Sequence, residues 1–112
     1  MIKERTMQYS GTNNEWADFW FEVDKGKVCG FNFNWPDGSV YSDGDGNLWI
    51  GYISFKEPRR LEKEECAELL LIEFPRIAME CGVPEDVREI VFSFLHERVI
   101  SGKNDDKSCC KG

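Results

Sequence analysis

The chain has 112 residues, of which 41% are hydrophobic and 13% are aromatic, enough for one packed core but not for two. It carries 21 acidic and 14 basic residues, for a formal net charge of −7. That balance argues against a nucleic-acid binder, because Lys and Arg contacts to phosphates supply most of the affinity in that class. It favours solubility, or attraction to a basic protein. We expect one domain over residues 1–100 and a disordered polar tail over residues 101–112.

The five cysteines are an odd number and lack the spacing of a disulfide framework. Cys29, Cys66 and Cys81 fall at apolar positions of predicted strands or helices, where a free cysteine behaves as a small hydrophobe. Cys109 and Cys110 have no second Cys or His pair at zinc-ligand spacing. The N-terminus has no apolar run for a signal peptide, and no segment reaches transmembrane length. These features predict a cytoplasmic protein.

The first half of the sequence is dominated by one predicted hairpin. Residues 2–10 fit a first edge strand, and residues 11–14, Gly-Thr-Asn-Asn, have the composition of a turn. The stretch from Trp16 to Trp35 then reads W-A-D-F-W-F-E-V-D-K-G-K-V-C-G-F-N-F-N-W. Apolar residues alternate with acidic, amide or aromatic residues in both of its halves, which is typical of strands with one buried face.

The turn of this hairpin sets which side chains share a face. A two-residue Lys-Gly turn would place Phe19 opposite an asparagine and mix apolar and polar residues on both faces. A three-residue loop over residues 24–26, with its glycine in the left-handed conformation, instead pairs Phe19 with Phe31 and Phe21 with Cys29. Because this choice gives a single apolar face, we predict the three-residue loop.

The other face of the predicted hairpin is an acidic patch with Trp20 in its middle. Exposed tryptophan is enriched at binding hot spots, and surrounding carboxylates steer a basic partner toward the site. The alternative is that another element covers this face and buries Trp20. The candidate partner-binding residues are Trp16, Asp18, Trp20, Glu22, Asp24, Asn32 and Asn34.

Two further strands are expected after the hairpin. Residues 36–38, Pro-Asp-Gly, form a turn, and residues 39–42 are expected to pair briefly. The segment from Leu48 to Phe55 is rich in β-branched and aromatic residues and is apolar on both parities. It is therefore predicted to be the most buried strand, either central or covered by helices on one side.

From Leu61 the hydrophobic period becomes that of a helix with an acidic outer surface over residues 62–68. Pro75 predicts a kink or two short helices, and Pro84 begins the next helix. Residues 89–95 fit a strand as well as a helix, and we predict the helix. The expected architecture is α+β: an antiparallel meander of three to five strands, then one or two C-terminal helices packed on one sheet face.

One loop superficially matches a calcium site. Asp43, Asp45 and Asn47 place oxygen-bearing side chains at alternate positions, but Leu48 stands where glycine is needed and Ser54 where the bidentate glutamate belongs. A plain turn is the prediction, and no metal or cofactor is expected.

No catalytic signature is apparent in the sequence. His96 is the single histidine, and its charged neighbours predict an exposed position. An acid and base for glycoside hydrolysis could come from Asp18, Glu22 and Asp24, but a chain this small leaves little room for a substrate cleft. We therefore predict a protein that is not an enzyme. A small calcium-responsive or enzymatic domain is the alternative from a different class.

In size, charge and the hairpin sequence W-A-D-F-W-F-E-V-D, the chain resembles small acidic bacterial toxin-immunity proteins and phage-encoded anti-defence inhibitors such as anti-CRISPR proteins. The resemblance lies in these general features and assigns no role to any single residue. It implies a protein inhibitor that binds a basic partner, most simply an immunity protein in the cleft of a nuclease toxin. Its alternative is a nucleic-acid mimic that blocks a nucleic-acid-directed defence complex.

Overall fold

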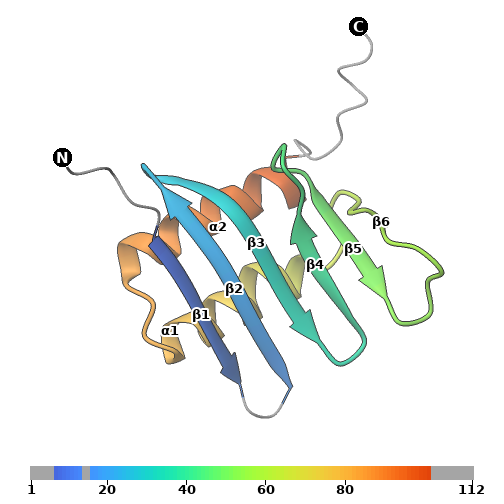
Figure 1. The fold of residues 1–112 in the computed structure, drawn as a ribbon, viewed down its shortest axis with the longest axis horizontal. Coiled ribbons are helices and arrows are strands. Elements are labelled where there is room, and N and C mark those ends of the chain that lie inside the picture. The colour runs from blue at the N-terminus through green and yellow to red at the C-terminus, as the bar shows by residue number, and fades with distance from the viewer. Residues whose placement is uncertain (1–6, 14–15, 102–112) are drawn as a thin grey trace, which may run out of the picture.

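The chain forms one antiparallel sheet whose strands lie in sequence order, with helices packed on one of its faces (Figure 1). The computed structural model describes residues 7–13 and 16–101. The predicted strand residues 2–6 and nearly all of the predicted tail therefore lie outside the described residues. The strands are β1 (Met7–Asn13), β2 (Ala17–Asp24), β3 (Lys27–Trp35), β4 (Gly38–Ser42), β5 (Leu48–Tyr52) and β6 (Arg59–Arg60). The helical elements are the π-helix η1 (Leu69–Glu73) and the α-helices α1 (Phe74–Glu80) and α2 (Glu85–Val99).

This architecture confirms the predicted α+β meander with C-terminal helices, and the two-residue β6 extends the sheet beyond the expected three to five strands. β1 covers residues 7–13, so the Gly-Thr-Asn segment predicted as a turn belongs to the strand. Seven backbone pairings with β2 outweigh the turn preference of those residues.

The β2–β3 hairpin differs from the predicted one in its turn. Lys25 and Gly26, with φ angles of 53° and 78°, form a two-residue turn between the paired residues Asp24 and Lys27. The register then shifts between Glu22 and Val23, where β3 has one extra residue. The predicted three-residue loop is therefore wrong, and so are the two pairs predicted with it, Phe19 with Phe31 and Phe21 with Cys29.

The bulge nevertheless keeps the predicted faces of the hairpin. Phe21 lies opposite Phe31 and Phe19 opposite Phe33, because the extra residue in β3 restores the parity that a longer loop would have provided. The bulge also displaces Cys29, which was predicted on the apolar face and is exposed. Cys81 is exposed as well, and only Cys66 is partly buried among the described cysteines.

The core lies between the sheet and the helices and is built around one aromatic side chain. Phe74 packs edge-on against the rings of four buried phenylalanines, at centroid distances of 5.4, 6.1, 5.3 and 5.4 Å. Such edge-to-face contacts add to the stabilisation that burial of the rings provides. The four partners of Phe74 are Phe19, Phe21, Phe31 and Phe33.

The helices follow the prediction in number but not in their boundaries. The first helical run begins at Ala67, two residues before η1, rather than at Leu61. Pro75 has no N–H to bond the preceding turn, and directly before it the Phe74 N–H bonds the carbonyl of Leu69, five residues back. The predicted interruption at Pro75 thus takes the form of a π-helical turn. Residues 89–95 are helical within α2, as predicted.

β5 is shorter and nearer the sheet edge than its composition predicted. It ends at Tyr52 and pairs with β4 and the edge strand β6. Leu48 and Ile50 are fully buried toward the helices, but Ile53, beyond the strand, is 77% exposed. The strand is therefore covered by helices on one side only, and β2 and β3, not β5, hold the buried phenylalanines.

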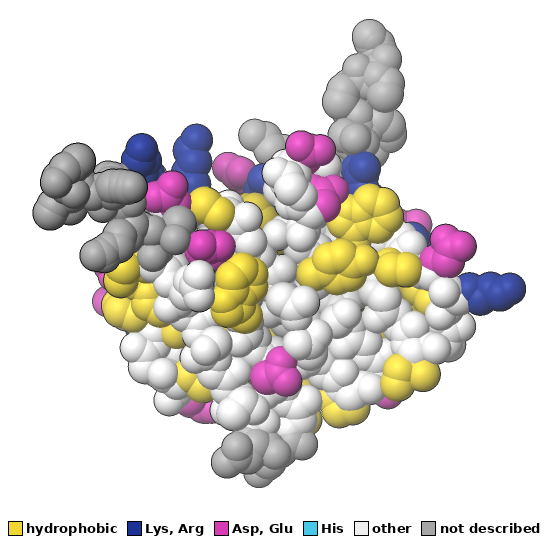
Figure 2. Space-filling model, in the orientation of Figure 1, with side chains coloured by type: hydrophobic (Ala, Val, Ile, Leu, Met, Phe, Trp, Pro, Cys, Tyr) yellow, Lys and Arg dark blue, Asp and Glu magenta, His cyan; other side chains and the backbone are white. Residues whose placement is uncertain are grey.

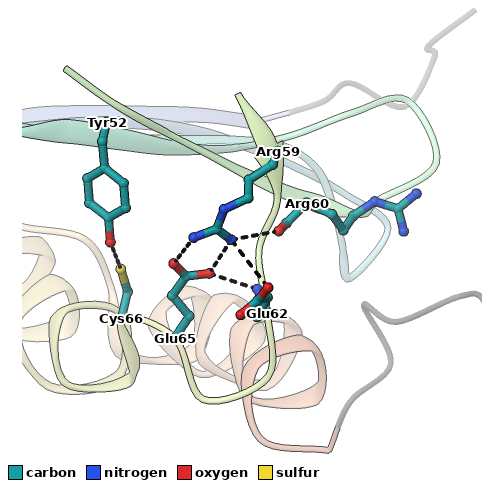
Figure 3. A network of polar contacts seen from close by, with 6 residues as sticks. All are labelled: Tyr52, Arg59, Arg60, Glu62, Glu65 and Cys66. Atoms are coloured by element: carbon teal, nitrogen blue, oxygen red, sulfur yellow. Dashed lines mark hydrogen bonds and ion pairs between the residues drawn. The ribbon is translucent and has the colours of Figure 1, made fainter. Parts of the chain in front are cut away.

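Between β6 and η1 the chain is held by a polar network (Figure 3). Arg59 donates two hydrogen bonds to the carboxylate of Glu65, at 2.9 and 2.7 Å, and Glu65 Oε1 also accepts the backbone N–H of Glu62 at 2.9 Å. Glu64 and Cys66, on either side of Glu65, have positive φ angles of 66° and 57°. This left-handed backbone is why the helix does not begin at Leu61.

The same network predicts a pH dependence of stability. The hydrogen bond between Tyr52 Oη and Cys66 Sγ (3.6 Å), with partial burial and the charge of Glu65, raises the pKa of Tyr52 to about 12. An unfolded chain ionises tyrosine near pH 10. The stabilisation from neutral Tyr52 is therefore complete below pH ~10 and is lost as the pH rises toward 12.

Urea denaturation of the wild-type protein and of Tyr52→Phe at several pH values tests this prediction. The difference in unfolding free energy between the two proteins is expected to narrow between pH 10 and about 12. A difference that stays constant across this interval would contradict it. Comparing the two proteins at each pH removes the contribution of other groups that titrate in the same range.

Candidate protein-binding face

The sheet face opposite the helices is open and carries a row of side chains across all six strands. Each member of the row lies directly opposite the next in the strand register. Figure 2 views this face, where separate hydrophobic groups and single acidic side chains lie among uncharged surface and the basic side chains lie at its margins. We call these residues the central row: Ser10, Trp20, Asn32, Tyr41, Trp49 and Arg60.

Trp20 is held against the sheet by a glycine on the neighbouring strand. A Cβ atom on Gly30 would lie 2.9 Å from both Cη2 and Cζ3 of the Trp20 ring, closer than real contacts allow. The glycine therefore lets the ring approach the β3 backbone, so that the tryptophan is positioned without a partner. The residue is 37% exposed, so the alternative in which another element covers Trp20 is wrong within the described part of the chain.

Carboxylates lie on both sides of Trp20 along β2. Asp18 is exposed and accepts a hydrogen bond from Asn34 Nδ2 on β3 at 2.7 Å. Glu22 is half-buried and lies opposite Gly30. Because Asp18 and Glu22 are four residues apart on one strand, their Cα atoms are separated by roughly 13 Å, with Trp20 midway. The tryptophan is thus flanked by two negative charges on a rigid strand.

Asp43 holds the end of the central row that lies on β5 through its hydrogen bonds. Its Oδ2 accepts the indole N–H of Trp49 at 2.8 Å, and its Oδ1 accepts the backbone N–H groups of Asp45 and Asn47 at 2.8 and 3.0 Å. The guanidinium of Arg60 lies over the Trp49 ring, 5.3 Å from its centroid. Partial burial raises the pKa of Asp43, but these three hydrogen bonds and the charge of Arg60 outweigh it, so the pKa lies below its ordinary value.

These contacts bear on the calcium candidates Asp43, Asp45 and Asn47. Both carboxylate oxygens of Asp43 are engaged in holding the turn and Trp49, as in an Asx turn. In the described ranges, no three His, Cys, Asp or Glu side chains gather as metal ligands would. The arrangement supports a plain turn.

The structure brings five of the seven predicted site residues together on the open face: Asp18, Trp20, Glu22, Asn32 and Asn34. Asp24 lies at the end of the hairpin, opposite Lys27. Trp16 packs edge-on against the core residue Phe33, at a centroid distance of 6.3 Å, and is therefore part of the packing rather than of the face. His96 is exposed on α2 beside Phe92, as predicted.

The sequence prediction did not include Tyr41, Trp49 or Arg60. Trp49 lies between Leu48 and Ile50, both buried, so its opposite parity was a usable signal. Tyr41 and Arg60 join the row only through the register of β4 with β3 and of β6 with β5, which composition does not fix.

Comparison with known proteins does not identify a relative: no family model, curated protein or solved structure matches the chain. Among the helices of residues 7–13 and 16–101, none has the length and apolar character needed to cross a bilayer.

Proposed function

We propose that this protein is a non-catalytic inhibitor that binds a basic protein through the open face of its sheet. The main support for this proposal is the position of Trp20. Its ring is exposed in the middle of the central row and is positioned by Gly30 between Asp18 and Glu22. In its most specific form the proposal is a cytoplasmic immunity protein for a nuclease-type toxin. The free thiols of Cys29, Cys66 and Cys81 suit a reducing compartment.

The physical basis is the combination of a rigid aromatic anchor with nearby carboxylates. A tryptophan that is already positioned loses little conformational entropy on binding, and tryptophan is enriched among interface hot spots. Carboxylates beside it steer a basic partner and suit a cleft that evolved to hold phosphates. The amide side chains of Asn32 and Asn34 supply donors and acceptors on the same surface.

Trp20→Ala tests the proposal, with Phe92→Ala as its matched control. Phe92 is 39% exposed against 37% for Trp20, but it lies on α2, on the other side of the molecule. We expect wild type and Phe92→Ala to retain a basic protein from a lysate of the source cell at low salt, and Trp20→Ala to bind the purified partner at least ~30-fold more weakly.

The identity and activity of the retained protein distinguish the immunity function from the anti-defence alternative. A nuclease that loses activity in the complex supports the immunity function, whereas a nucleoprotein defence complex supports the anti-defence alternative. In either case duplex DNA is expected to compete with the protein, because both occupy the same basic surface. Equal retention by wild type and Trp20→Ala would show that the open face is not the binding surface.

A further inference from the structure

The two edges of the sheet are built differently. β6 has two residues, Arg59 and Arg60, and a short, charged edge strand resists pairing with another chain. β1 has seven residues, M-Q-Y-S-G-T-N, with no charge and no proline, and it pairs with β2 without a bulge. Short length and charge, two features that protect an edge strand, are therefore present at β6 and missing from β1, where Cys81 packs beside Gly11 and covers one end of the edge.

The register shows which backbone groups of β1 point away from the sheet. The Phe31 N–H donates to Ser42 Oγ of β4 at 3.0 Å, so the Phe31 backbone faces β4 and not β2. Phe21, which lies opposite Phe31, must then direct its own N–H and C=O toward β1, where it pairs with Tyr9.

Because these directions alternate along a strand, the backbone groups of Gln8, Ser10 and Thr12 face outward. In the described part of the chain, no strand pairs with that side of β1. A weak thiol contact reaches it, from Cys81 Sγ to the Thr12 carbonyl at 3.8 Å. The outward backbone N–H and C=O groups of these three residues could thus form hydrogen bonds with another strand.

We infer that β1 pairs with β1 of a second copy of this chain, antiparallel and centred on Ser10. Ser10 then lies opposite Ser10 of the second copy, and Gln8 lies opposite Thr12. All three outward residues form hydrogen-bonded pairs, with two bonds in each pair. The self-pairing register leaves none of their N–H or C=O groups without a strand partner.

Side chains also fit this register. On the helix side, Tyr9 lies opposite Gly11 of the second copy, and Cys81 packs beside that glycine, so Tyr9 would meet a small residue and a thiol rather than a bulky side chain. On the open side, Gln8, Ser10 and Thr12 are exposed and uncharged, so no like charges oppose each other. A charged strand paired with itself about a two-fold axis would place like charges close together, and β1 avoids this.

The net charge of −7 does not prevent this association. On the open face, the acids beside β1 lie on the neighbouring strand, with Asp18 opposite Thr12 and Glu22 opposite Gln8, and Trp20 lies between them. Three strand spacings would separate the two Trp20 residues of a pair, about 14 Å, whereas the Debye length at physiological ionic strength is about 8 Å. We therefore expect pairing to be unchanged or strengthened by salt.

The resulting pair would have a continuous sheet with both open faces on the same side, because the two-fold axis of an antiparallel strand pair is perpendicular to the sheet. Two Trp20 anchors would then lie side by side. An interface formed by one strand is small, so we expect a dissociation constant on the order of 10 µM to 1 mM.

Charge variants at Ser10 test the pairing directly, because this residue lies opposite itself. Sedimentation velocity of the full chain at concentrations up to about 1 mM is expected to show two-chain species for wild type. Ser10→Lys alone and Ser10→Glu alone are expected to be single chains, because like charges then face each other across the axis. An equimolar mixture of the two variants is expected to form two-chain species again. Circular dichroism of each variant confirms that the fold is intact.

Ser10→Pro provides an independent variant. It removes the outward Ser10 N–H without removing a bond to β2, and it is expected to abolish pairing while the protein stays folded. A wild type that is a single chain at all concentrations would overturn the inference. So would two-chain species that persist in Ser10→Lys, or a mixture of the charge variants that fails to pair. Partner binding through Trp20 weakens with salt and self-pairing does not, so failure of one is distinguishable from failure of the other.

Discussion

Phe74→Ala is expected to lower the free energy of unfolding by about 3–5 kcal/mol, the range for removing a buried aromatic ring. Phe74 is 2% exposed and, among the described residues, is the one ring that contacts Phe19, Phe21, Phe31 and Phe33 together. Its loss leaves a cavity between α1 and the two central strands, which the paired backbone of β2 and β3 cannot collapse to fill. A domain of this size has about 5–15 kcal/mol of stability in total, so the expected loss is a large fraction of it.

Urea denaturation followed by tryptophan fluorescence measures this loss. Phe92→Ala is the control, because Phe92 is 39% exposed and its replacement should change the free energy by no more than about 0.5 kcal/mol. A Phe74→Ala variant that lost less than ~1.5 kcal/mol would indicate that the helices pack on the sheet more loosely than the buried position of Phe74 implies.

The largest effect on partner binding is expected from reversing both charges beside Trp20. Asp18→Lys combined with Glu22→Lys is expected to weaken binding of the basic partner at least 100-fold at low salt, because attraction becomes repulsion at two positions of the interface. The fold is expected to persist, since Asp18 is exposed and its hydrogen bond to Asn34 is at the surface. Calorimetry or surface plasmon resonance with the purified partner measures the change.

A second charge reversal, Glu68→Lys with Glu89→Lys, controls for net charge. Both glutamates are exposed and lie in the helical part of the chain, so the total charge changes equally while the open face does not. Affinity should fall only modestly, through long-range steering. If both double variants weakened binding to the same degree, net charge rather than the open face would account for recognition.

The faces of the β2–β3 hairpin could be predicted from the sequence because alternation is strict there. Phe19, Phe21, Phe31 and Phe33 are all buried, and the residues between them point to the other side. The faces were predicted correctly although the turn and the paired residues were wrong. A bulge in β3 and a longer loop shift the register by one residue in opposite directions, and either shift puts the phenylalanines on one face. The hydrophobic period therefore determines which side chains share a face of the hairpin, even where it does not determine the turn.

The central row could not be assembled in the same way. The part of the row on β4, β5 and β6 requires Tyr41 opposite Trp49 and Trp49 opposite Arg60. Each of these pairings depends on a loop, and composition does not determine the length or conformation of that loop. The start of the first helical run at Ala67 was missed for a related reason. The Arg59–Glu65 ion pair and the left-handed residues Glu64 and Cys66 hold the preceding segment in a non-helical conformation, although its hydrophobic period fits a helix.

The order of the elements along the chain has a consequence for biosynthesis. Strands β1 to β5 end at Tyr52, whereas the helices that cover them occupy residues 69–99. At a translation rate of about 5–20 residues per second, the hairpins leave the ribosome roughly 2–10 s before the last helix is complete. During that interval the phenylalanine face of a nascent sheet has no helix to cover it. We therefore expect the growing chain to depend on holdase chaperones, and translational pausing in the helical region to increase its aggregation.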